Sequence, residues 1–304
     1  MKLIQNLIDN HPKTNETENM DLVLESGAAN GGFHVGCLLY IKSLEKKKII
    51  KIDRISGSSI GAIAGFYYLI NSLQDFLEIY KKMRDCFKNN LNVGILKSIL
   101  EKKINELSDE EFIYLNERLF IVYYDVSQRK QIQINKFTEK KDLLNSLLKS
   151  SHIPFITQNS LYYVDNETNS LDGGMPYVFP KRNVGDKKIL YINICVYNKL
   201  TSLFSVKKEL NPYGRLLEGA LDAHNFFLYK GKSKFCSFVN NWGIFDYTLL
   251  RLKELIFKML IYSIIICYYV YKIFYPLISR FYIVEYLSPV FYNFYRDMLL
   301  FYCV

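Results

Sequence analysis

Apolar and polar residues alternate along the first part of the chain in blocks that predict strands and helices in turn. Short segments with central or spaced apolar residues, predicted as strands at 21–25 and 52–56, are each followed by a glycine-containing turn. Apolar residues at helical spacing come next, at 34–47 and 60–71. Strand, turn and helix in this order are typical of parallel α/β units, whose loops meet at the carboxyl ends of the strands. The sequence therefore predicts an α/β fold with a mostly parallel sheet.

Similar blocks continue as far as residue 229. The further strands indicated by β-branched and aromatic residues are 119–126, 131–135, 161–164 and 188–197. The further helices are expected from Ser72, around 94–107, after the capping box of Ser108 and Glu111, at 139–150 and at 211–229. We therefore expect a domain at 20–229, preceded by a short lead-in at 1–19.

The chain beyond this domain, 230–304, has a different pattern. Residues 255–278 are almost wholly apolar and are interrupted only by Lys258 and Lys272. The uncharged part, 259–271, is shorter than the roughly 20 residues of a membrane-spanning helix, although a lysine at its end can extend towards the membrane surface. Three alternatives remain open: a transmembrane helix, a helix lying in the membrane interface, and a buried core helix.

Charge distinguishes between two classes of partner. The net charge is +9, which suits either nucleic acid or an anionic membrane. From Lys230 onwards the basic residues are interspersed with aliphatic and aromatic ones, and no nucleic-acid-binding motif is present. The sequence therefore predicts membrane contact through 255–302 and no binding of nucleic acid.

Cysteine spacing and the N-terminus indicate the compartment. The six cysteines are far apart and form no C-x-x-C pair, so neither a disulfide framework nor a zinc site is predicted. The first apolar cluster is too short for a signal peptide. No cluster of His, Cys, Asp and Glu has metal-ligand spacing, and no metal or cofactor is expected. We predict a membrane-associated protein on the reducing, cytoplasmic side, not a secreted one.

The pentapeptide Gly57-Ser58-Ser59-Ile60-Gly61 lies between a predicted strand and a predicted helix. This is the context of a nucleophile elbow, in which glycines permit a sharp turn that exposes the central serine. Ser59 is therefore a candidate nucleophile, although the pentapeptide alone is a weak signal. The loop 26–32 between the first strand and helix is rich in small residues. It lacks the Lys-Ser/Thr of a P-loop and the full G-x-G-x-x-G spacing, which argues against nucleotide binding.

Four segments in one order resemble the motifs of patatin-like phospholipases. The run from Leu22 to Leu38 resembles the glycine-rich first motif of this family, and the elbow at Ser59 follows it. Residues 149–154, Lys-Ser-Ser-His-Ile-Pro, are similar to the A-S-x-x-x-P stretch, and Asp172-Gly173-Gly174 resembles the D-G-G/A motif. The resemblance spans about residues 20 to 200 and excludes the lead-in and the tail.

The resemblance implies a three-layer, doubly wound α/β fold with a catalytic dyad of serine and aspartate. Carried over by motif, Ser59 is the nucleophile and Asp172 is its base. Backbone N–H groups of the first motif would form the oxyanion hole, with Gly27, Ala28 and Ala29 as the corresponding residues. The remaining motif positions are Gly57, Gly61, Asn30, Gly31, Gly173 and Gly174.

The chain departs from the family pattern in the first motif. Where the family has G-G-G-x-R/K-G, the chain has Ser26 and Ala28 in place of two glycines and Asn30 in place of the basic residue. If the third position needs a positive φ, Ala28 is strained. Phe179-Pro180 stands where many members have Asn-Pro. His34 could form a triad with Ser59, but the family needs no histidine base, and we interpret His34, His152 and His224 as structural.

These observations predict a lipid acyl-ester hydrolase of the phospholipase A or lipase kind that works through an acyl-enzyme. Membrane phospholipids or acylglycerols are the expected substrates. Two alternatives use the same fold: a catalytically degraded, membrane-bound interaction protein, suggested by the altered first motif, and a lipid acyltransferase, in which an alcohol replaces water.

Overall fold

The structure is a computed structural model that describes residues 2–9, 17–165, 168–180, 187–199, 201–203, 211, 213–278, 294 and 296–298. The chain divides into two compact units. The larger unit comprises Met1–Phe204 and Glu209–Trp242, and the smaller comprises Ser205–Lys208 and Gly243–Val304. Most of the predicted membrane segment beyond residue 278 lies outside the described residues.

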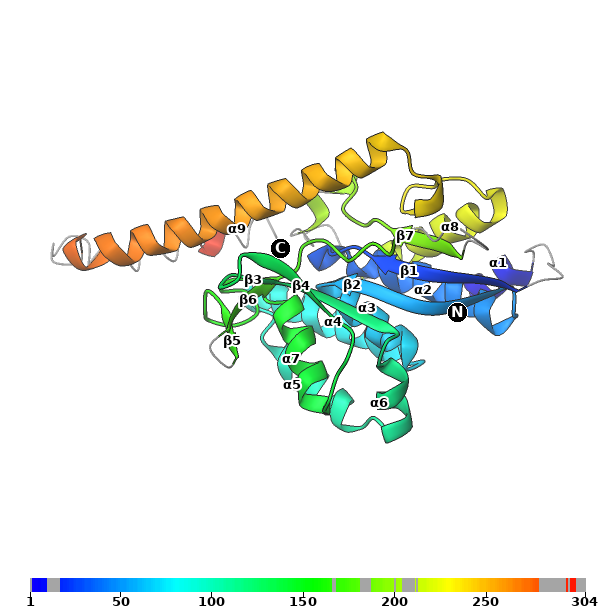
Figure 1. Ribbon diagram of the computed structural model, residues 1–304, viewed down its shortest axis with the longest axis horizontal. Coiled ribbons are helices and arrows are strands. Elements are labelled where there is room, and N and C mark those ends of the chain that lie inside the picture. The colour runs from blue at the N-terminus through cyan, green and yellow to red at the C-terminus, as the bar shows by residue number, and fades with distance from the viewer. Residues whose placement is uncertain are drawn as a thin grey trace. The chain divides into compact units, whose positions relative to one another are not determined.

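An eight-stranded sheet forms the centre of the larger unit (Figure 1). Its hydrogen-bonded neighbours follow the path β5-β6-β3-β2-β1-β7-β8, and β4 pairs with β3 along the edge opposite β2 and β6. The neighbours β3, β2, β1 and β7 are parallel, whereas β4, β5, β6 and β8 pair in antiparallel fashion. The strands are β1 (Glu18–Leu24), β2 (Ile50–Ser58), β3 (Leu119–Asp125), β4 (Lys130–Ile134), β5 (Tyr163–Asp165), β6 (Thr168–Asp172), β7 (Lys188–Ile192) and β8 (Cys236–Phe238). The predicted α/β class with a mostly parallel, mixed sheet is confirmed.

Helices lie before β1 and in several of the connections between these strands. They are α1 (Lys2–Asp9), α2 (Gly31–Lys46), α3 (Ile60–Leu69), α4 (Leu73–Asn90), α5 (Ile95–Asn105), α6 (Asp109–Leu115), α7 (Lys140–Ser150) and α8 (Tyr213–Tyr229). The predicted capping box is present at α6, where the Ser108 hydroxyl accepts from the Glu111 N–H and the Glu111 carboxylate accepts from the Ser108 N–H. The predicted lead-in contains α1, whose Ile4 and Ile8 are buried in the hydrophobic core.

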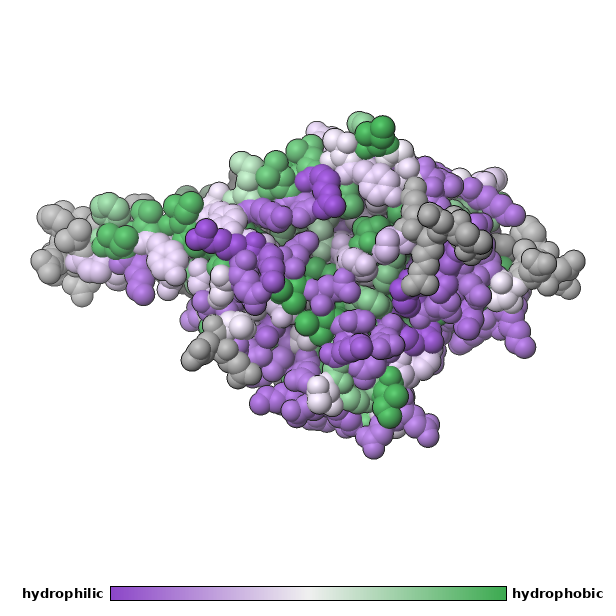
Figure 2. Space-filling view, viewed as in Figure 1, coloured by the Kyte–Doolittle hydropathy of each residue, from purple (hydrophilic) through white to green (hydrophobic). Residues whose placement is uncertain are grey.

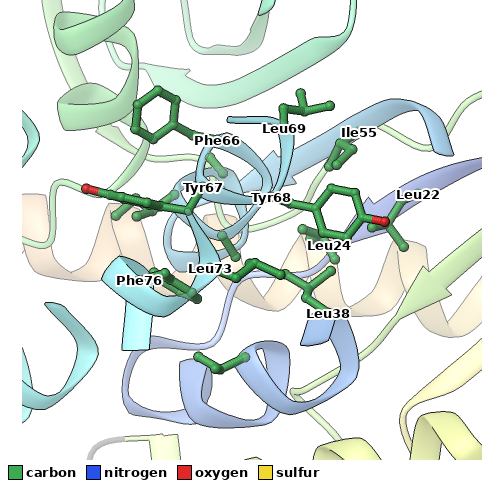
Figure 3. Packing of buried hydrophobic residues seen from close by; sticks show 14 of the residues in the cluster. Leu22, Leu24, Leu38, Ile55, Phe66, Tyr67, Tyr68, Leu69, Leu73 and Phe76 are labelled. Atoms are coloured by element: carbon green, nitrogen blue, oxygen red, sulfur yellow. The ribbon is translucent and has the colours of Figure 1, made fainter. Parts of the chain in front are cut away.

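The core is centred on α3, which is apolar on every side. All ten of its residues are buried, as expected for a helix without a polar face. Around it lie side chains from two strands and two further helices (Figure 3). The labelled side chains of this cluster are Leu22, Leu24, Leu38, Ile55, Phe66, Tyr67, Tyr68, Leu69, Leu73 and Phe76.

Neighbouring residues of β2 point to opposite faces of the sheet, so Arg54 faces away from this core. Its guanidinium pairs with the buried carboxylate of Asp21 on β1 and lies 4.4 Å from the ring centre of Phe179. Phe179 also packs edge-to-face on Phe120 of β3, with 5.0 Å between ring centres. Phe179, which occupies a position where many patatin-like proteins have asparagine, therefore helps to cover the second face of the sheet.

The structure corrects several predicted boundaries. The strand expected at 188–197 ends at Ile192, and a 3-10 turn follows at Tyr197–Lys199. The short strands β6 and β8 were not predicted. Thr-Asn-Ser-Leu-Asp is mostly polar and Cys-Ser-Phe has only three residues, and they become strands by pairing with β3 and β7. β8 follows residue 229, where the predicted domain ends.

The smaller unit contains one long helix, α9 (Ile244–Ile278), which starts before the predicted apolar segment. Within the described residues, its part Ile244–Pro276 is long and apolar enough to cross a membrane. Only 6% of its most apolar window is buried, whereas a core helix is mostly buried. Apolar surface is visible along α9 (Figure 2). The exposed apolar residues of this helix include Ile264, Ile266 and Ile273.

Candidate active site

The predicted elbow joins β2 to α3, and Ser59 occupies its apex. Ser59 has φ 55° and ψ −128°, a backbone conformation that residues other than glycine rarely adopt. A strained backbone conformation of this kind destabilises the fold by on the order of 1–3 kcal/mol. It is retained only where surrounding contacts hold the residue in place. The Ser59 carbonyl accepts hydrogen bonds from the N–H groups of Ala62 (3.0 Å) and Ile63 (3.2 Å), so the serine caps the start of α3.

Close backbone approach explains both glycines of the elbow. A Cβ at Gly57 would lie 2.5 Å from the backbone of Gly61 and Ala62, and a Cβ at Gly61 would lie 2.5 Å from the Leu24 carbonyl oxygen. These contacts are shorter than real Cβ atoms show, and backbone cannot move aside as a flexible side chain can. Gly57 therefore lets the elbow turn tightly on itself, and Gly61 lets it pack directly against the end of β1.

Strand pairing explains why Asp172 lies near Ser59. β2 pairs with the first half of β3 and ends with Ser58 opposite Val122. β6 approaches from the opposite direction and ends with Asp172 opposite Tyr123. β4 pairs with these same residues of β3 along its other edge. β2 and β6 therefore run towards each other along one edge of β3 and end on neighbouring residues.

The Asp172 carboxylate is buried. Its Oδ1 accepts a hydrogen bond from the Gly174 N–H at 2.7 Å, and the Ser59 hydroxyl lies near enough to lower its pKa. Burial raises the pKa of Asp172 to about 6, and this effect exceeds the opposing effects of the Ser59 hydroxyl and the Gly174 N–H. The structure thus brings together the two residues predicted as nucleophile and base, and it gives the carboxylate a raised proton affinity.

Ser150, at the end of α7, supports the elbow from the segment similar to A-S-x-x-x-P. Its hydroxyl accepts a hydrogen bond from the Ser59 N–H (2.9 Å) and donates one to the Val122 carbonyl (2.6 Å). Its own carbonyl accepts from the Gly173 N–H at 3.3 Å. Ser150 therefore connects the nucleophile, β3 and the segment after Asp172. The sequence singled out this segment as a motif without indicating that Ser150 contacts the nucleophile.

The small-residue loop forms a 3-10 turn at Ala28–Asn30, directly before α2. Ala28 has φ 41°, so its position does need a positive φ, and the strain expected for alanine there is present. The Asn30 N–H bonds to the Gly27 carbonyl, and the Gly31 N–H bonds to the Ala28 carbonyl. Within the turn, the N–H groups of Asn30 and Gly31 are thus the donors, and those of Ala28 and Ala29 take no part in these two hydrogen bonds.

Asn30 occupies the position where the first-motif pattern has a cation, and it is fully buried. Its side-chain amide donates to the Ile194 carbonyl (2.9 Å) and to the Lys199 carbonyl (3.2 Å), while its oxygen accepts from the Ser202 hydroxyl (2.8 Å). Asn30 therefore ties the loop to the chain that follows β7.

Three histidines of the described residues have structural partners. His34 is buried and its Nε2 donates to the Glu25 carbonyl at 2.7 Å, while burial lowers its pKa to about 4. His152 Nδ1 lies 3.0 Å from the Thr157 hydroxyl, and His224 Nδ1 lies 3.1 Å from the Tyr40 hydroxyl. These contacts agree with the structural roles expected for all three.

Comparison with known proteins identifies the family. The family model described as patatin-like phospholipase matches residues 22–181, more than half of the chain. The chain belongs to the patatin-like phospholipase family. The match includes the small-residue loop, the elbow and Asp172. Membership of this family supports lipid acyl hydrolase activity for this patatin-like protein. A comparison with curated proteins gave no match.

Proposed function

We propose that this patatin-like protein hydrolyses lipid acyl esters through an acyl-enzyme on Ser59, with Asp172 as the base. The observation that carries the proposal is a serine on a strained elbow whose hydroxyl lies beside a buried carboxylate, and the pKa of this carboxylate is raised to about 6 by burial. A serine hydroxyl is a weak nucleophile until a neighbouring group accepts its proton. A carboxylate of ordinary pKa is a poor acceptor, so burial makes Asp172 better suited to this role.

The proposed reaction has two balanced steps. Ser59 Oγ attacks the acyl carbonyl carbon while its proton passes to Asp172, and the oxyanion is held by the N–H groups of Ala28 and Ala29. The intermediate collapses to the acyl-enzyme, and the leaving alcohol takes the proton from Asp172. Water then attacks the acyl-enzyme in the same way, so that the fatty acid leaves and Ser59 regains its proton. One oxyanion-hole donor contributes roughly 3 kcal/mol in serine hydrolases.

Hydrolysis of defined phospholipids and acylglycerols by the full chain, with identification of the products, tests this proposal. Free fatty acid supports hydrolysis, whereas transfer of the acyl group to an added alcohol or lipid identifies an acyltransferase. A fluorophosphonate probe should label Ser59 covalently. A folded chain with neither turnover nor labelling would identify the non-enzymatic alternative suggested by Ala28 and Asn30.

We expect the pH dependence of kcat/KM to follow Asp172. The base acts in its ionised form, so kcat/KM should fall about tenfold per pH unit below pH about 6, the raised pKa of Asp172. The measurement uses a soluble short-chain ester at constant ionic strength, with circular dichroism at each pH to confirm folding. A profile that stays flat down to pH about 4.5 would contradict Asp172 as a buried base.

Ser150→Ala should lower kcat roughly tenfold, because the Ser59 N–H loses its acceptor and the elbow is held less firmly. Ser151→Ala is the matched control. Ser151 is the next residue and is also buried, but its hydroxyl donates to the Leu147 carbonyl within the end of α7. Steady-state kinetics of both variants decides the matter, and equal kcat values for the two would contradict a role for Ser150 at the nucleophile.

We also propose that α9 attaches the protein to a bilayer on the cytoplasmic side, where its substrate is available and cysteines remain reduced. The uncharged stretch Met259–Tyr271 has 13 residues and is about 20 Å long, against about 30 Å for the hydrocarbon core. This length favours a helix in the interface. Extraction with alkaline carbonate should release such a helix and should retain a spanning one.

Ile266→Glu should weaken co-sedimentation of the full chain with anionic phospholipid vesicles roughly tenfold, because a carboxylate enters the apolar surface of α9. Ile266 is 59% exposed. Ile113 on α6 is 68% exposed and lies in the larger unit, so Ile113→Glu is the matched control. Equal effects of the two substitutions would contradict attachment through α9.

A further inference from the structure

A buried arginine from α8 reaches the loop that follows β1. Arg215 lies in the first turn of α8 and is 7% exposed. Its Nη1 atom lies 2.6 Å from the Ala29 carbonyl oxygen, 2.8 Å from Asn30 Oδ1 and 3.0 Å from the Ser202 carbonyl oxygen. One guanidinium nitrogen thus contacts two successive residues of the 3-10 turn and the chain that covers it.

The Ala29 carbonyl is held from a second direction as well. The hydroxyl of Tyr80 on α4 donates to the same oxygen at 2.6 Å. A carbonyl that accepts from two helices cannot rotate without losing both bonds, and the bond to a charged donor is the stronger kind. The peptide between Ala29 and Asn30 is therefore fixed by groups far from it in sequence.

The helix that carries Arg215 is itself firmly placed. A Cβ at Gly36 of α2 would lie 1.9 Å from the Leu216 carbonyl oxygen, so the backbones of α2 and α8 are in direct contact next to Arg215. α2 begins directly after the 3-10 turn. The turn is thus continuous with α2, and Arg215 belongs to α8. These two helices cannot move apart without opening a close-packed interface.

We infer that Arg215 is a positioning residue that holds the Ala28–Asn30 turn in the geometry of an oxyanion hole. This inference rests on the proposed function. Ala28 is strained at φ 41°, and a strained turn needs contacts that hold it. The loop's own sequence has no cation, and Arg215 provides one at Asn30. Donors held in place before the reaction stabilise a developing oxyanion more than mobile ones do.

Arg215→Met, which keeps a long side chain without charge or donors, tests this inference in the full chain. Turnover of a soluble ester should show kcat reduced at least tenfold and KM changed less than threefold, because the oxyanion forms only in the transition state. Amide hydrogen exchange of peptides covering 27–32 should be faster in the variant. The inference is overturned if an active wild type and Arg215→Met share the same kcat, or if exchange in 27–32 is unchanged.

Arg118→Met is the matched control. Arg118 donates to the Ile52 carbonyl at 2.8 Å and packs on Tyr114, so it also joins an arginine to the backbone, at the start of β2 and away from the loop. The Arg118→Met variant should have a kcat within twofold of the wild-type value and unchanged amide hydrogen exchange in 27–32. A kcat loss equal to that of Arg215→Met would show a general effect of lost arginines and would overturn the inference.

Two further variants cover the case in which Arg215→Met does not fold. Arg215→Lys keeps the charge but not the guanidinium geometry, and it should show an intermediate kcat with KM unchanged. Tyr80→Phe removes the other donor to the Ala29 carbonyl, and it should lower kcat more strongly in the Arg215→Lys background than alone. Strict additivity would contradict a shared role. If the wild type itself is inactive, the proposed function fails, and hydrogen exchange in 27–32 still decides whether Arg215 holds the turn.

Discussion

Ser59→Ala should lower ester hydrolysis at least a hundredfold and abolish labelling by a fluorophosphonate. The alanine removes the oxygen that forms the acyl-enzyme. The residual activity then comes only from substrate binding and the proposed oxyanion hole, as in other serine hydrolases that lose their nucleophile. The measurement compares kcat/KM on one soluble ester and on one phospholipid.

Ser58→Ala is the control for this substitution. Ser58 is the preceding residue and is fully buried in β2, and among the described residues its hydroxyl has no hydrogen-bond partner. Removing that hydroxyl should leave hydrolysis and labelling within about threefold of the wild type. Hydrolysis retained by Ser59→Ala would disprove the assignment of the nucleophile.

Asp172→Asn should reduce kcat roughly a thousandfold, because the amide oxygen can still accept from the Gly174 N–H but the amide cannot take the proton of Ser59. Asp125→Asn is the control for loss of a buried carboxylate. Asp125 ends β3 and accepts from the Gln128 N–H at 3.0 Å. Its variant should keep kcat within about threefold, and equal losses in the two variants would contradict the role of Asp172.

The same substitution should stabilise the fold at neutral pH. The pKa of Asp172 is about 6 in the folded protein against 3.8 for an ordinary aspartate, so the folded state binds the proton more tightly. Wild-type stability therefore declines as the pH rises from about 4 to about 6, by on the order of 2–3 kcal/mol. The amide of the Asp172→Asn variant carries no such charge. The Tm advantage of the variant should be small at pH 4, grow through pH 6 and then stay constant. A Tm advantage that is largest at pH 4 would contradict the raised pKa.

The regular part of the fold could be predicted because it follows local patterns. β1 and α3 have apolar runs of the right length, β2 carries three isoleucines between polar residues, and the glycines of the elbow indicate the turn between β2 and α3. The strain at Ala28 could also be anticipated, since alanine occupies a slot that the family pattern gives to glycine.

The remaining parts depend on contacts that no local pattern records. β6 is a polar pentapeptide that becomes a strand only because β3 offers an unpaired edge beyond Ser58. Arg215 is 185 residues from Asn30 in sequence. Because the loop 26–32 contains no cation, the sequence alone indicated a weakened site. In the structure, Arg215 of α8 provides a positive charge at this loop.

β2 and β6 end at neighbouring positions on one edge of β3. The distance between the nucleophile and the base is therefore set by β3 and does not depend on the length of the chain between them. The nucleophile and the base are 113 residues apart in sequence, yet their strands end opposite Val122 and Tyr123, which share a single peptide bond. Helices α4, α5 and α6 lie between β2 and β3, and they could lengthen or shorten without moving either residue. One residue inserted into β3 would shift one strand end against the other by about 3.3 Å, which exceeds the tolerance of a hydrogen bond. Evolution is therefore free to vary the helices before β3 and is tightly restricted within it.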